Sequence, residues 1–429
     1  MKKFFISVGL AAAGTASLQA TYAPDLGAMQ TTKFWSVSGT LRGFYDDNYT
    51  TSPNGQKQGS GGFEVSPSVS FDVPLQQTEL GLRYTYGMYY YQDRQNNGND
   101  PVDQTHQVDL WVDHAFSERW QATVKDTLAV GQEPSLLNDQ AQPYRVNGNN
   151  VVNNGNVALT TDWTRLFSTV LSYNNGYYYY ENSGGNNLPP YLNPSQNGLL
   201  TRDDQTLGLD LQWAVAPETT ALIGYNFDFV DYWGDEPISY QPGNPLLPVY
   251  SNSRNTQSHI AYIGAQHSFM ANLQVSAKVG VEDTAYVNSS DPNYVTPYAV
   301  TTASYTYAPG SYVQLGVSHL QNATYVIAPN NLGNITQNQQ STIISASVNH
   351  QITAKLMGSI IGNAMLSTFN QGAYNNQGEQ FYTAGVNLTY SFNQHLSTEV
   401  GYNFDDLQSN VPGNGYSRNR VYVGLTAAY

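Results

Sequence analysis

The sequence predicts an all-β fold: a transmembrane up-and-down antiparallel β-barrel of about eighteen strands, with sixteen as the alternative. Three observations predict it. Apolar and polar residues alternate with a period of two from Lys33 to the last residue, which gives each strand two unlike faces. The connections between the alternating segments are short and long in turn. Charged residues make up only 11% of the 429 residues, yet the mean hydropathy is −0.42.

This composition suits a sheet with one wet face and one lipid-facing face. The chain replaces charge with uncharged polar residues and with 34 Tyr. The net charge of −15 argues against nucleic acid as a partner. Because Cys is absent, the chain can form neither disulfides nor Cys-ligated metal sites.

The first twenty residues have the pattern of a signal peptide. The basic start MKK precedes the apolar stretch FFISVGLAAAG, which is too short to span a membrane. Small residues follow, with Ala20 as the expected last residue removed, although the cleavage site could shift by a few positions. We expect 1–20 to be a signal peptide, 21–32 a periplasmic N-terminal segment and 33–429 the barrel. No long apolar run follows, so a helical membrane protein is excluded.

The period-two pattern divides the barrel region into strands. In WSVSGTLRGFY, Trp35, Val37 and Leu41 share one face, whereas Thr40 and Arg42 lie on the other. Most segments have ~9–13 residues, the length that a tilted strand needs to cross hydrocarbon. They begin near residues 33, 62, 78, 105, 120, 151, 165, 205, 219, 257, 273, 297, 311, 339, 355, 379, 396 and 419.

Short and long connections alternate between these segments. The short ones are 74–77, 117–119, 214–218, 270–272, 308–310, 351–354 and 393–395; the long ones are 47–61, 92–104, 132–150, 182–204, 232–256, 287–296, 320–338, 371–378 and 406–418. An up-and-down meander has this order because all hairpins of one kind lie on the same side. We expect short periplasmic turns and long extracellular loops.

Aromatic rings and imidazoles on the apolar phase recur beside the short turns. They include His114, Phe116, Trp120, Trp213, His267, Phe269, Tyr390 and Phe392. Amphipathic rings at one height in strand after strand are typical of a girdle at a membrane–water interface. A second girdle is expected at the opposite strand ends, from Tyr84, Tyr86, Tyr90, Tyr173, Tyr225, Phe227, Phe229, Tyr402 and Phe404.

The last residues, NRVYVGLTAAY, have the pattern of a complete strand. A backbone in lipid must satisfy every N–H and C=O internally, so the sheet must close. We therefore expect residues 421–429 to pair with residues 33–46 and seal the barrel. An even number of strands places both ends of the barrel chain on the short-turn side.

This last strand resembles the C-terminal assembly signal of bacterial outer-membrane barrels, which ends in an aromatic residue preceded by apolar residues at every second position. Tyr429, Leu425 and Val423 match, whereas Ala427 is smaller than usual. The mature chain resembles the outer-membrane porin-like barrels, including the putative β-barrel porin 2 group. The resemblance implies a Gram-negative outer membrane, diffusion of small solutes and often homotrimers. The expected partners are outer-membrane lipid and, through the strand ending at Tyr429, the outer-membrane assembly machinery.

The polar phase should line the lumen, and its charged residues are few. They are Arg42, Glu64, Asp72, Glu79, Arg83, Asp109, Asp113, Lys125, Asp210, Lys278, Glu282, Glu399 and Arg420. Carboxylates outnumber bases, so a pore lined in this way should modestly favour cations. Alternatively, these charges pair across the wall and only solvate the lumen. A barrel of this size leaves an open channel, and its uncharged polar lining would also suit saccharides.

Porins of this class often narrow the lumen with an inward-folded loop. The third long connection is the candidate for such a constriction, with Glu133, Asp139 and Arg145. The segment 232–236 is the rival, and both could also be simple exposed loops. Residues 93–100 offer oxygen ligands but lack the EF-hand spacing, so no metal site is expected.

Two aspartates interrupt the apolar phase. Asp283 is late in its segment and could reach the rim, whereas Asp126 lies near the middle of its segment. A carboxylate facing lipid there would cost on the order of 2 kcal/mol. Either a β-bulge that flips the phase or a contact with another subunit would relieve this cost, and the sequence leaves both open.

The sequence carries no G-x-S-x-G, H-E-x-x-H or phosphate-binding loop, so we expect neither catalysis nor a cofactor. The function we expect is a passive channel for small hydrophilic solutes, mildly cation-preferring or permissive to saccharides. The alternatives are a barrel associated with polysaccharide export and a structural or adhesive barrel whose long loops bind outside the cell.

Overall fold

The computed structural model describes residues 34–96, 100–132, 143–181, 195–233, 236–241, 244–289 and 291–429. The expected signal peptide (1–20) and periplasmic segment (21–32) lie outside this part of the chain. The strands are β1 (Trp35–Asp46), β2 (Ser60–Pro74), β3 (Thr78–Tyr91), β4 (Val102–Ala115), β5 (Trp120–Gly131), β6 (Asn150–Asp162), β7 (Phe167–Tyr179), β8 (Arg202–Ala216), β9 (Thr219–Asp231), β10 (Pro237–Gln241), β11 (Asn244–Tyr250), β12 (Thr256–Met270), β13 (Leu273–Tyr286), β14 (Tyr294–Ala308), β15 (Ser311–Asn322), β16 (Thr336–Gln351), β17 (Leu356–Gln371), β18 (Gly378–Asn393), β19 (Leu396–Ser409) and β20 (Tyr416–Ala428). The helices are α1 (Gln92–Asn96), α2 (Gln196–Leu200) and the 3₁₀ helix η2 (Ser251–Arg254).

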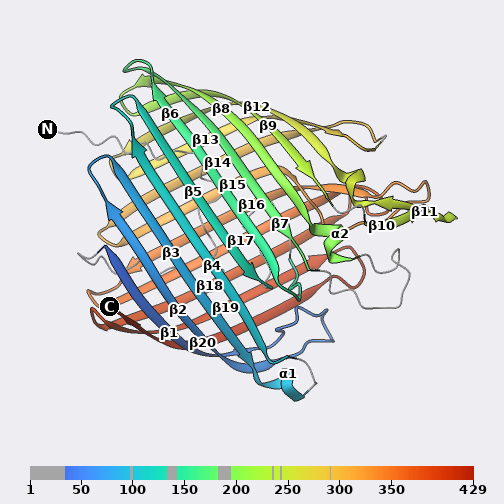
Figure 1. The fold of residues 1–429 in the computed structure, drawn as a ribbon, viewed down its shortest axis with the longest axis horizontal. Helices are drawn as coiled ribbons and strands as arrows, with labels where there is room; N and C mark the ends of the chain where they lie inside the picture. The colour runs from blue at the N-terminus through green and yellow to red at the C-terminus, as the bar shows by residue number, and fades with distance from the viewer. Residues whose placement is uncertain are drawn as a thin grey trace.

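Eighteen of these strands form one closed sheet (Figure 1). Each pairs antiparallel with its neighbours in the chain, β9 pairs with β12 across the β10–β11 hairpin, and β20 pairs with β1. The up-and-down barrel and the count of eighteen are therefore confirmed. Every expected strand start lies within three residues of the observed one, because a polar loop and an alternating strand differ plainly in sequence.

The long connection 232–256 differs from a plain loop. It contains the β10–β11 hairpin and η2, which project beyond the barrel together with α2 (Figure 1). Both hairpin strands are short and contain proline, so period-two alternation could not reveal them. None of the helices in the described residues is long and apolar enough to cross a membrane.

The seam between the first and last strands closes the barrel. β1 and β20 pair without interruption from Ser38 opposite Ala428 to Asp46 opposite Arg420. Beyond this register, the backbones of Val37 and Tyr429 exchange hydrogen bonds of 3.1 and 2.8 Å. The rings of Trp35 and Tyr429 lie 5.8 Å apart on the same wall. The seam thus has no open edge, as hydrocarbon requires.

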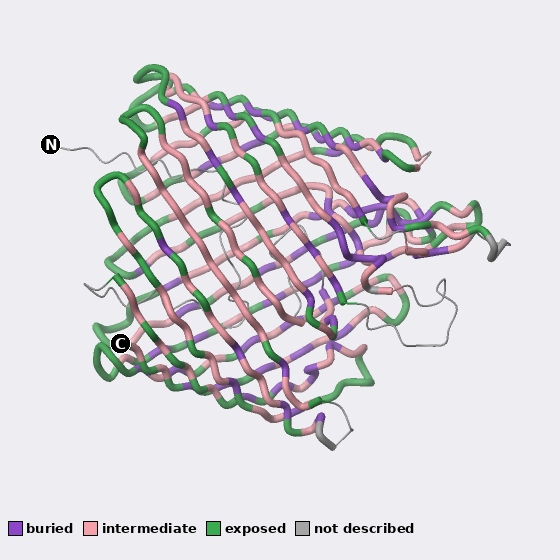
Figure 2. The backbone as a smooth tube through the Cα atoms, in the orientation of Figure 1, coloured by how far each residue is buried: buried purple, intermediate pink, exposed green. Residues whose placement is uncertain are grey.

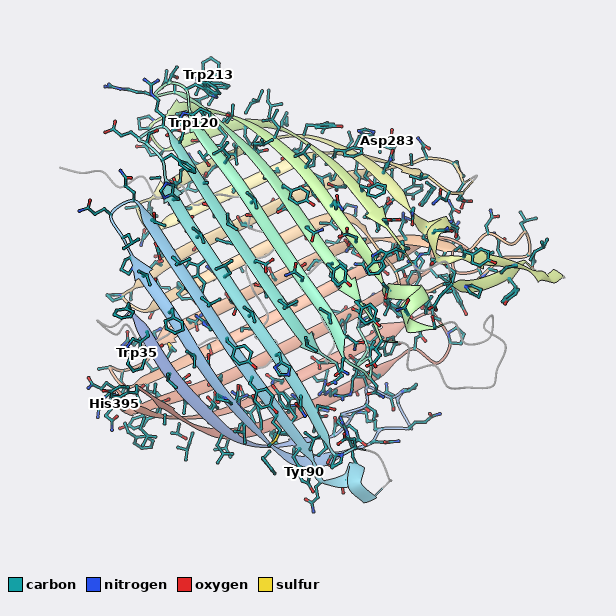
Figure 3. All side chains as sticks on the ribbon, viewed as in Figure 1. Trp35, Tyr90, Trp120, Trp213, Asp283 and His395 are labelled. Carbon is teal, nitrogen blue, oxygen red and sulfur yellow. The ribbon has the colours of Figure 1, made fainter. Side chains whose placement is uncertain are left out.

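The apolar phase forms the outer surface of the barrel. Val423, Ile263 and Ile223 are each at least 60% exposed. Trp35, Trp120, Trp213 and His395 lie toward the short-turn end, and Tyr90 lies toward the loop end (Figure 3). In a soluble protein so much ordered apolar surface would aggregate, whereas in a bilayer it contacts acyl chains.

Imidazoles on this outer wall pair with hydroxyls of neighbouring strands. Thr78 binds His114 Nδ1 at 2.7 Å, and Thr219 binds His267 Nδ1 at 2.8 Å. In both cases a phenylalanine two residues farther along the chain contacts the imidazole edge-on, at 4.4 Å between ring centroids. The repeat supports the expected periplasmic girdle, in which ring-shaped amphipathic groups sit at the interface.

The inner wall is packed closely at certain glycines. Gly401 lies on the inner phase of β19, opposite Tyr422 of β20, and a Cβ at Gly401 would stand 2.2 Å from that ring. By contrast, a Cβ on Gly39 of β1 would face open space on the outer wall. The packing therefore requires glycine at position 401 but not at position 39.

We predict that Gly401→Val destabilises the folded barrel whereas Gly39→Val does not. The new side chain at position 401 must displace the Tyr422 ring, and overpacking of this kind costs about 1–3 kcal/mol. The measurement is the temperature at which the purified barrel loses its folded mobility on a denaturing gel. Equal melting temperatures for the two variants would contradict the packing described for Gly401.

Candidate functional site

The first inner-wall network is centred on Arg42 of β1. Its guanidinium contacts Glu64 of β2 and Glu399 of β19, each at 2.6 Å. Glu399 is two strands away, and the residue between them in register is Gly424 of β20. Because Gly424 has no side chain, Arg42 reaches across the strand. Three of the expected lumen residues therefore form one cluster.

A second network repeats this design on the far side of the barrel. Asp210 of β8 accepts hydrogen bonds from Tyr262 Oη at 2.6 Å and from Lys278 Nζ at 2.9 Å. The strand between Asp210 and Tyr262 carries Gly224 at that register. Lys278 also lies 4.7 Å from the centroid of the Tyr262 ring. The charges of Asp210 and Lys278 thus cancel within the wall.

In the periplasmic half of the lumen, the wall formed by β2–β5 carries acidic residues that are not neutralised in this way. Asp72 and Glu79 are exposed, and Glu79 lies directly opposite Asp113 of β4. Asp113 accepts a hydrogen bond of 2.5 Å from Thr123. The juxtaposition of like charges makes this part of the wall acidic.

Farther along the same strands, Asp109 accepts hydrogen bonds from Gln107 and Thr127 at 2.9–3.0 Å. Arg83 is its direct cross-strand neighbour. Lys125 lies on the inner phase of β5, opposite Trp111, and is exposed. These two residues are the bases of β2–β5, so carboxylates outnumber bases in this region.

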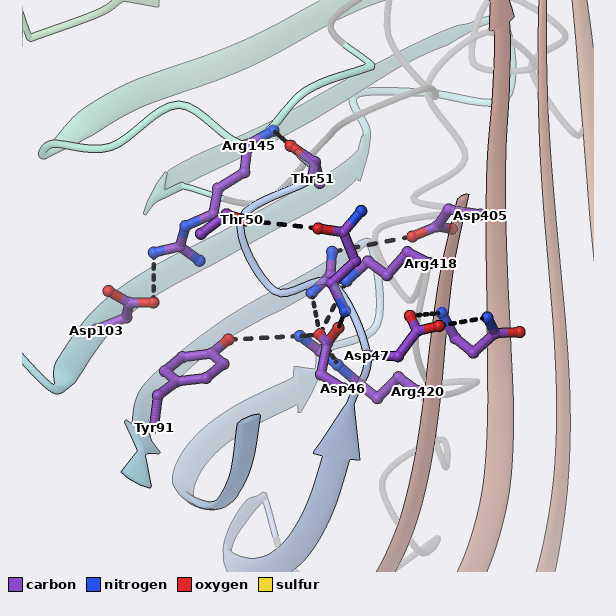
Figure 4. Close-up of polar contacts among 12 residues, drawn as sticks. Asp46, Asp47, Thr50, Thr51, Tyr91, Asp103, Arg145, Asp405, Arg418 and Arg420 are labelled. Carbon is purple, nitrogen blue, oxygen red and sulfur yellow. Dashed lines mark hydrogen bonds and ion pairs between the residues drawn. The ribbon is translucent and has the colours of Figure 1, made fainter. Parts of the chain in front are cut away.

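The extracellular half of the lumen holds a compact arginine–aspartate cluster at the β1–β20 seam (Figure 4). Asp46, fully buried, accepts hydrogen bonds from Arg418 at 2.6 and 2.8 Å and from Arg420 at 2.9 and 3.0 Å. Asp405 of β19 lies 3.9 Å from Arg418. Of this cluster, sequence reasoning named only Arg420. The signal that could have found Asp46 is its place on the same phase of β1 as Arg42; its register opposite Arg420 comes from the closed seam.

A neighbouring cluster brings in the loop between β5 and β6. Asp103 of β4 is bound by Arg94 at 2.7 Å and by Arg145 at 2.5 Å. The Arg145 backbone N–H donates to Thr51 of the β1–β2 loop at 3.0 Å. Arg94 stacks on the Tyr91 ring at 4.0 Å. Arg145 is therefore held by two other segments of the mouth (Figure 4).

Tyr144 connects the same loop to other segments at the mouth of the barrel. Its ring contacts Tyr325 of the β15–β16 loop at 5.3 Å and Tyr416 of β20 at 5.6 Å between centroids. Its hydroxyl donates to the backbone carbonyl of Asn414, and Tyr416 Oη donates to Pro143 O at 2.5 Å. Burial raises the pKa of Tyr144 well above its usual range. The β15–β16 loop lies about half a turn of the barrel away from the β5–β6 loop.

The other two expected constriction residues, Glu133 and Asp139, lie outside the described residues. Of the rival segment 232–236, Tyr232 is buried and packs under Arg254. Glu282 is buried in β13 and accepts a hydrogen bond from the backbone N–H of Gln321 at 3.3 Å.

Several loops share a small apolar core above the barrel. It contains Val146, Tyr178, Tyr180, Leu199, Leu200, Ile238 and Ile335. Figure 2 shows buried residues gathered at this end of the molecule. Burial raises the pKa of Tyr180 to about 12. The mouth is therefore covered in part by a packed cap, here called the loop cap, rather than by independent loops.

Arg254 of η2 links the pieces of the loop cap. Its guanidinium donates to the backbone carbonyls of Leu199 at 3.0 Å and Thr324 at 2.5 Å. These acceptors belong to the α2 segment and to the β15–β16 loop. Because Arg254 is almost fully buried, desolvation lowers its pKa from the usual arginine value. Sequence reasoning missed Arg254, since a lone arginine in a polar loop has no distinguishing pattern.

No group of three or more His, Cys, Asp and Glu side chains with metal-binding geometry occurs among the described residues. The segment 93–100 instead contributes Arg94, whose partner is Asp103.

Comparison with known proteins gives one family match, over the last part of the chain. The family described as putative beta-barrel porin 2 matches residues 323–429, which span β16–β20 and the preceding loop. No curated protein matches the chain.

Solved structures with a similar outline include OccAB3 of Acinetobacter baumannii, with 10% identity, TM-score 0.43 and coverage of 92% of this chain and 99% of that one. A BenF-like porin from Pseudomonas fluorescens Pf-5 has 9% identity, TM-score 0.45 and coverage of 92% and 99%. OpdK of Pseudomonas aeruginosa with vanillate has 9% identity, TM-score 0.44 and the same coverage. At these identities and scores, the solutes of those channels have no bearing on this chain.

The family match confirms the resemblance over residues 323–429. The closed eighteen-stranded sheet and its apolar outer wall are those of a barrel that spans a membrane. Together they place the chain among the β-barrels of the bacterial outer membrane, and residues 323–429 match the family described as putative beta-barrel porin 2.

Proposed function

We propose that the barrel lets small hydrophilic solutes diffuse passively across the outer membrane and prefers cations. A barrel of eighteen strands is wide enough to hold water. The observation that carries the preference is the acidic wall of the periplasmic lumen, where Asp72, Glu79 and Asp113 lie close together. Elsewhere the lumen charges are largely paired, so this region dominates the potential that a permeating ion meets.

The second part of the proposal is that the β5–β6 loop constricts the channel. Tyr144 and Arg145 fasten this loop to several other segments of the mouth. A loop held at several points narrows the path permanently instead of moving aside. The solute must then pass beside the loop cap before it reaches the acidic wall.

The lumen also suits saccharides. Partly exposed amide and hydroxyl groups line the inner wall, such as Ser168 with Gln212 at 3.5 Å and Ser68 with Thr85 at 3.0 Å. Such groups exchange hydrogen bonds with sugar hydroxyls at small cost. Sugar-dependent block of the ionic current would support this part of the proposal.

We further propose that the strand ending at Tyr429 is read by the outer-membrane assembly machinery. Its support is the exposed apolar stripe of Val421, Val423 and Leu425, which continues to the aromatic residue.

We predict that Asp72→Asn, Glu79→Gln and Asp113→Asn together lower the cation-over-anion permeability ratio by roughly twofold, because the focusing negative potential is removed. The measurement is the reversal potential of the protein in a planar bilayer under a KCl gradient. The matched control is Asp283→Asn with Asp406→Asn, which removes charge from the outer phase of β13 and β19.

An unchanged reversal potential in the triple variant would show that the acidic wall does not cause the cation preference. Absence of any stepwise current from the wild-type protein would contradict the channel itself and favour a structural or adhesive barrel.

We predict that Tyr144→Ala combined with Arg145→Ala raises the single-channel conductance, because the β5–β6 loop loses its attachments at the mouth. The control is Leu332→Ala, in a side chain that is 85% exposed in the β15–β16 loop. Folded mobility on a gel establishes that each variant is a barrel. Wild-type conductance in a folded double variant would show that this loop does not limit the current.

A further inference from the structure

Of the tryptophans in the described strands, Trp111 is the one that faces the lumen. It lies on the inner phase of β4 and is partly exposed. Trp35, Trp120 and Trp213 lie instead on the outer phase, toward the short-turn end (Figure 3). The membrane interface accounts for those three rings. It does not account for Trp111, whose surroundings are the water and the side chains of the channel.

Gly81 of β3 makes room for the indole of Trp111. The two residues are direct cross-strand neighbours. A Cβ on Gly81 would stand 1.7 and 1.9 Å from the indole atoms Cε2 and Cζ2, so the indole occupies the space of the missing side chain. The ring is therefore turned toward β3, whereas Lys125 is the neighbour of Trp111 on the other side, in β5. The packing fixes an aromatic surface on the inner wall.

Two carboxylates flank the position that the indole occupies. Asp72 of β2 is the cross-strand neighbour of Gly81, and Glu79 precedes Gly81 by two residues on the same inner phase of β3. Both side chains are exposed. Within the part of the chain that the structure describes, neither carboxylate has a hydrogen bond or an ion pair. Each can therefore pair with a cation that passes through the lumen.

The bases of this wall lie on other sides of the ring. Arg83 is directly opposite Asp109, on the side of Gly81 away from Glu79. Lys125 is on β5, on the side of Trp111 away from Gly81. In register, neither base stands between the indole and the carboxylates of Asp72 and Glu79. The aromatic surface and the two carboxylates thus form one continuous part of the wall.

We propose that Trp111, Asp72 and Glu79 form a subsite for small organic cations of the alkylammonium class. This inference rests on the proposed channel function and names a class of solute within its cation preference. The positive charge of an alkylammonium ion is attracted by the face of the indole and by the two carboxylates, and its alkyl groups contact the ring. A metal cation gains only from the charges. A saccharide gains from the ring but leaves both carboxylates without a counter-ion.

Binding is measured independently of conduction by fluorine NMR of the folded barrel in detergent, with fluorotryptophan in place of tryptophan. The six tryptophans give up to six resonances, and Trp111→Phe identifies the resonance of Trp111 by its loss. Choline chloride is the probe. The Trp111 resonance should move saturably with choline and stay in place with equal concentrations of sodium chloride or glucose. No movement with choline, or equal movement with glucose, would overturn the proposal.

Block of the KCl current by choline in a planar bilayer tests the aromatic part of the subsite. Trp111→Leu should raise the half-blocking choline concentration about fivefold, because the cation–π contact is lost. Gly81→Ala should act in the same direction, since its Cβ displaces the indole without changing any charge. The matched control is Tyr312→Leu, which removes a partly exposed inner-wall ring of β15, opposite Asn349 and about half a turn of the barrel away.

The carboxylates are tested by Asp72→Asn with Glu79→Gln, which should raise the half-blocking concentration at least as much as Trp111→Leu. The matched control is Asp126→Asn. Asp126 lies on the outer phase of β5, and the pairing of β5 with β4 and β6 runs through it without a register shift. A β-bulge at Asp126, one of the two explanations left open by the sequence, is therefore wrong, and its carboxylate does not face the lumen.

The outcomes separate the subsite from the channel. If the wild type carries no current but choline moves the Trp111 resonance, the subsite stands and the proposed channel fails. If the wild type conducts and choline blocks folded Trp111→Leu and Gly81→Ala at the wild-type concentration, the subsite is wrong and the channel stands. Folded mobility on a gel establishes that each variant is a barrel.

Discussion

Closure of the sheet is the constraint on which the rest of this molecule depends. In hydrocarbon, an unpaired backbone N–H or C=O costs several kcal/mol, so one open edge would leave a whole row of such groups exposed. The β1–β20 seam removes the edge with continuous pairing from Ser38 to Asp46. Asp46 then does more than end a strand, because it binds Arg418 and Arg420 of the closing strand. The same seam therefore completes the wall and gathers charges from the two ends of the barrel sequence.

Glycines in the barrel wall allow polar and charged side chains that lie two strands apart to contact each other. Arg42 reaches Glu399 over Gly424, and Tyr262 reaches Asp210 over Gly224. In each case a glycine in the middle strand lets residues two strands apart touch. These pairs are shielded from water on the wall side, so their attraction is stronger than that of an exposed pair. They neutralise charge locally, so the proposed cation preference rests on the acidic periplasmic wall.

At the extracellular end, apolar packing between loops organises the structure, whereas charge pairs organise the inner wall. Residues from several loops form the loop cap around Tyr178 and Tyr180, and Arg254 joins its pieces through backbone carbonyls. Loops that share a core move together or not at all. The long connections, which as sequence are only polar, therefore act as one structural unit beside the path of the solute.

Period-two alternation determined the positions and number of the barrel strands and which residues face outward. The alternation of short and long connections indicated which strand ends carry the periplasmic turns. Both depend on local spacing alone. Period-two alternation also placed Asp126 and Asp283 on the outer phase. The sequence did not show which residues pair with the lumen charges. Such a pair forms when a glycine on the strand between them leaves room, and the order and register of the strands are fixed only in the closed barrel. The loop cap was invisible for the same reason: its residues are distant in sequence, and contacts such as that of Tyr144 with Tyr325 exist only when opposite sides of a ring of strands are brought face to face.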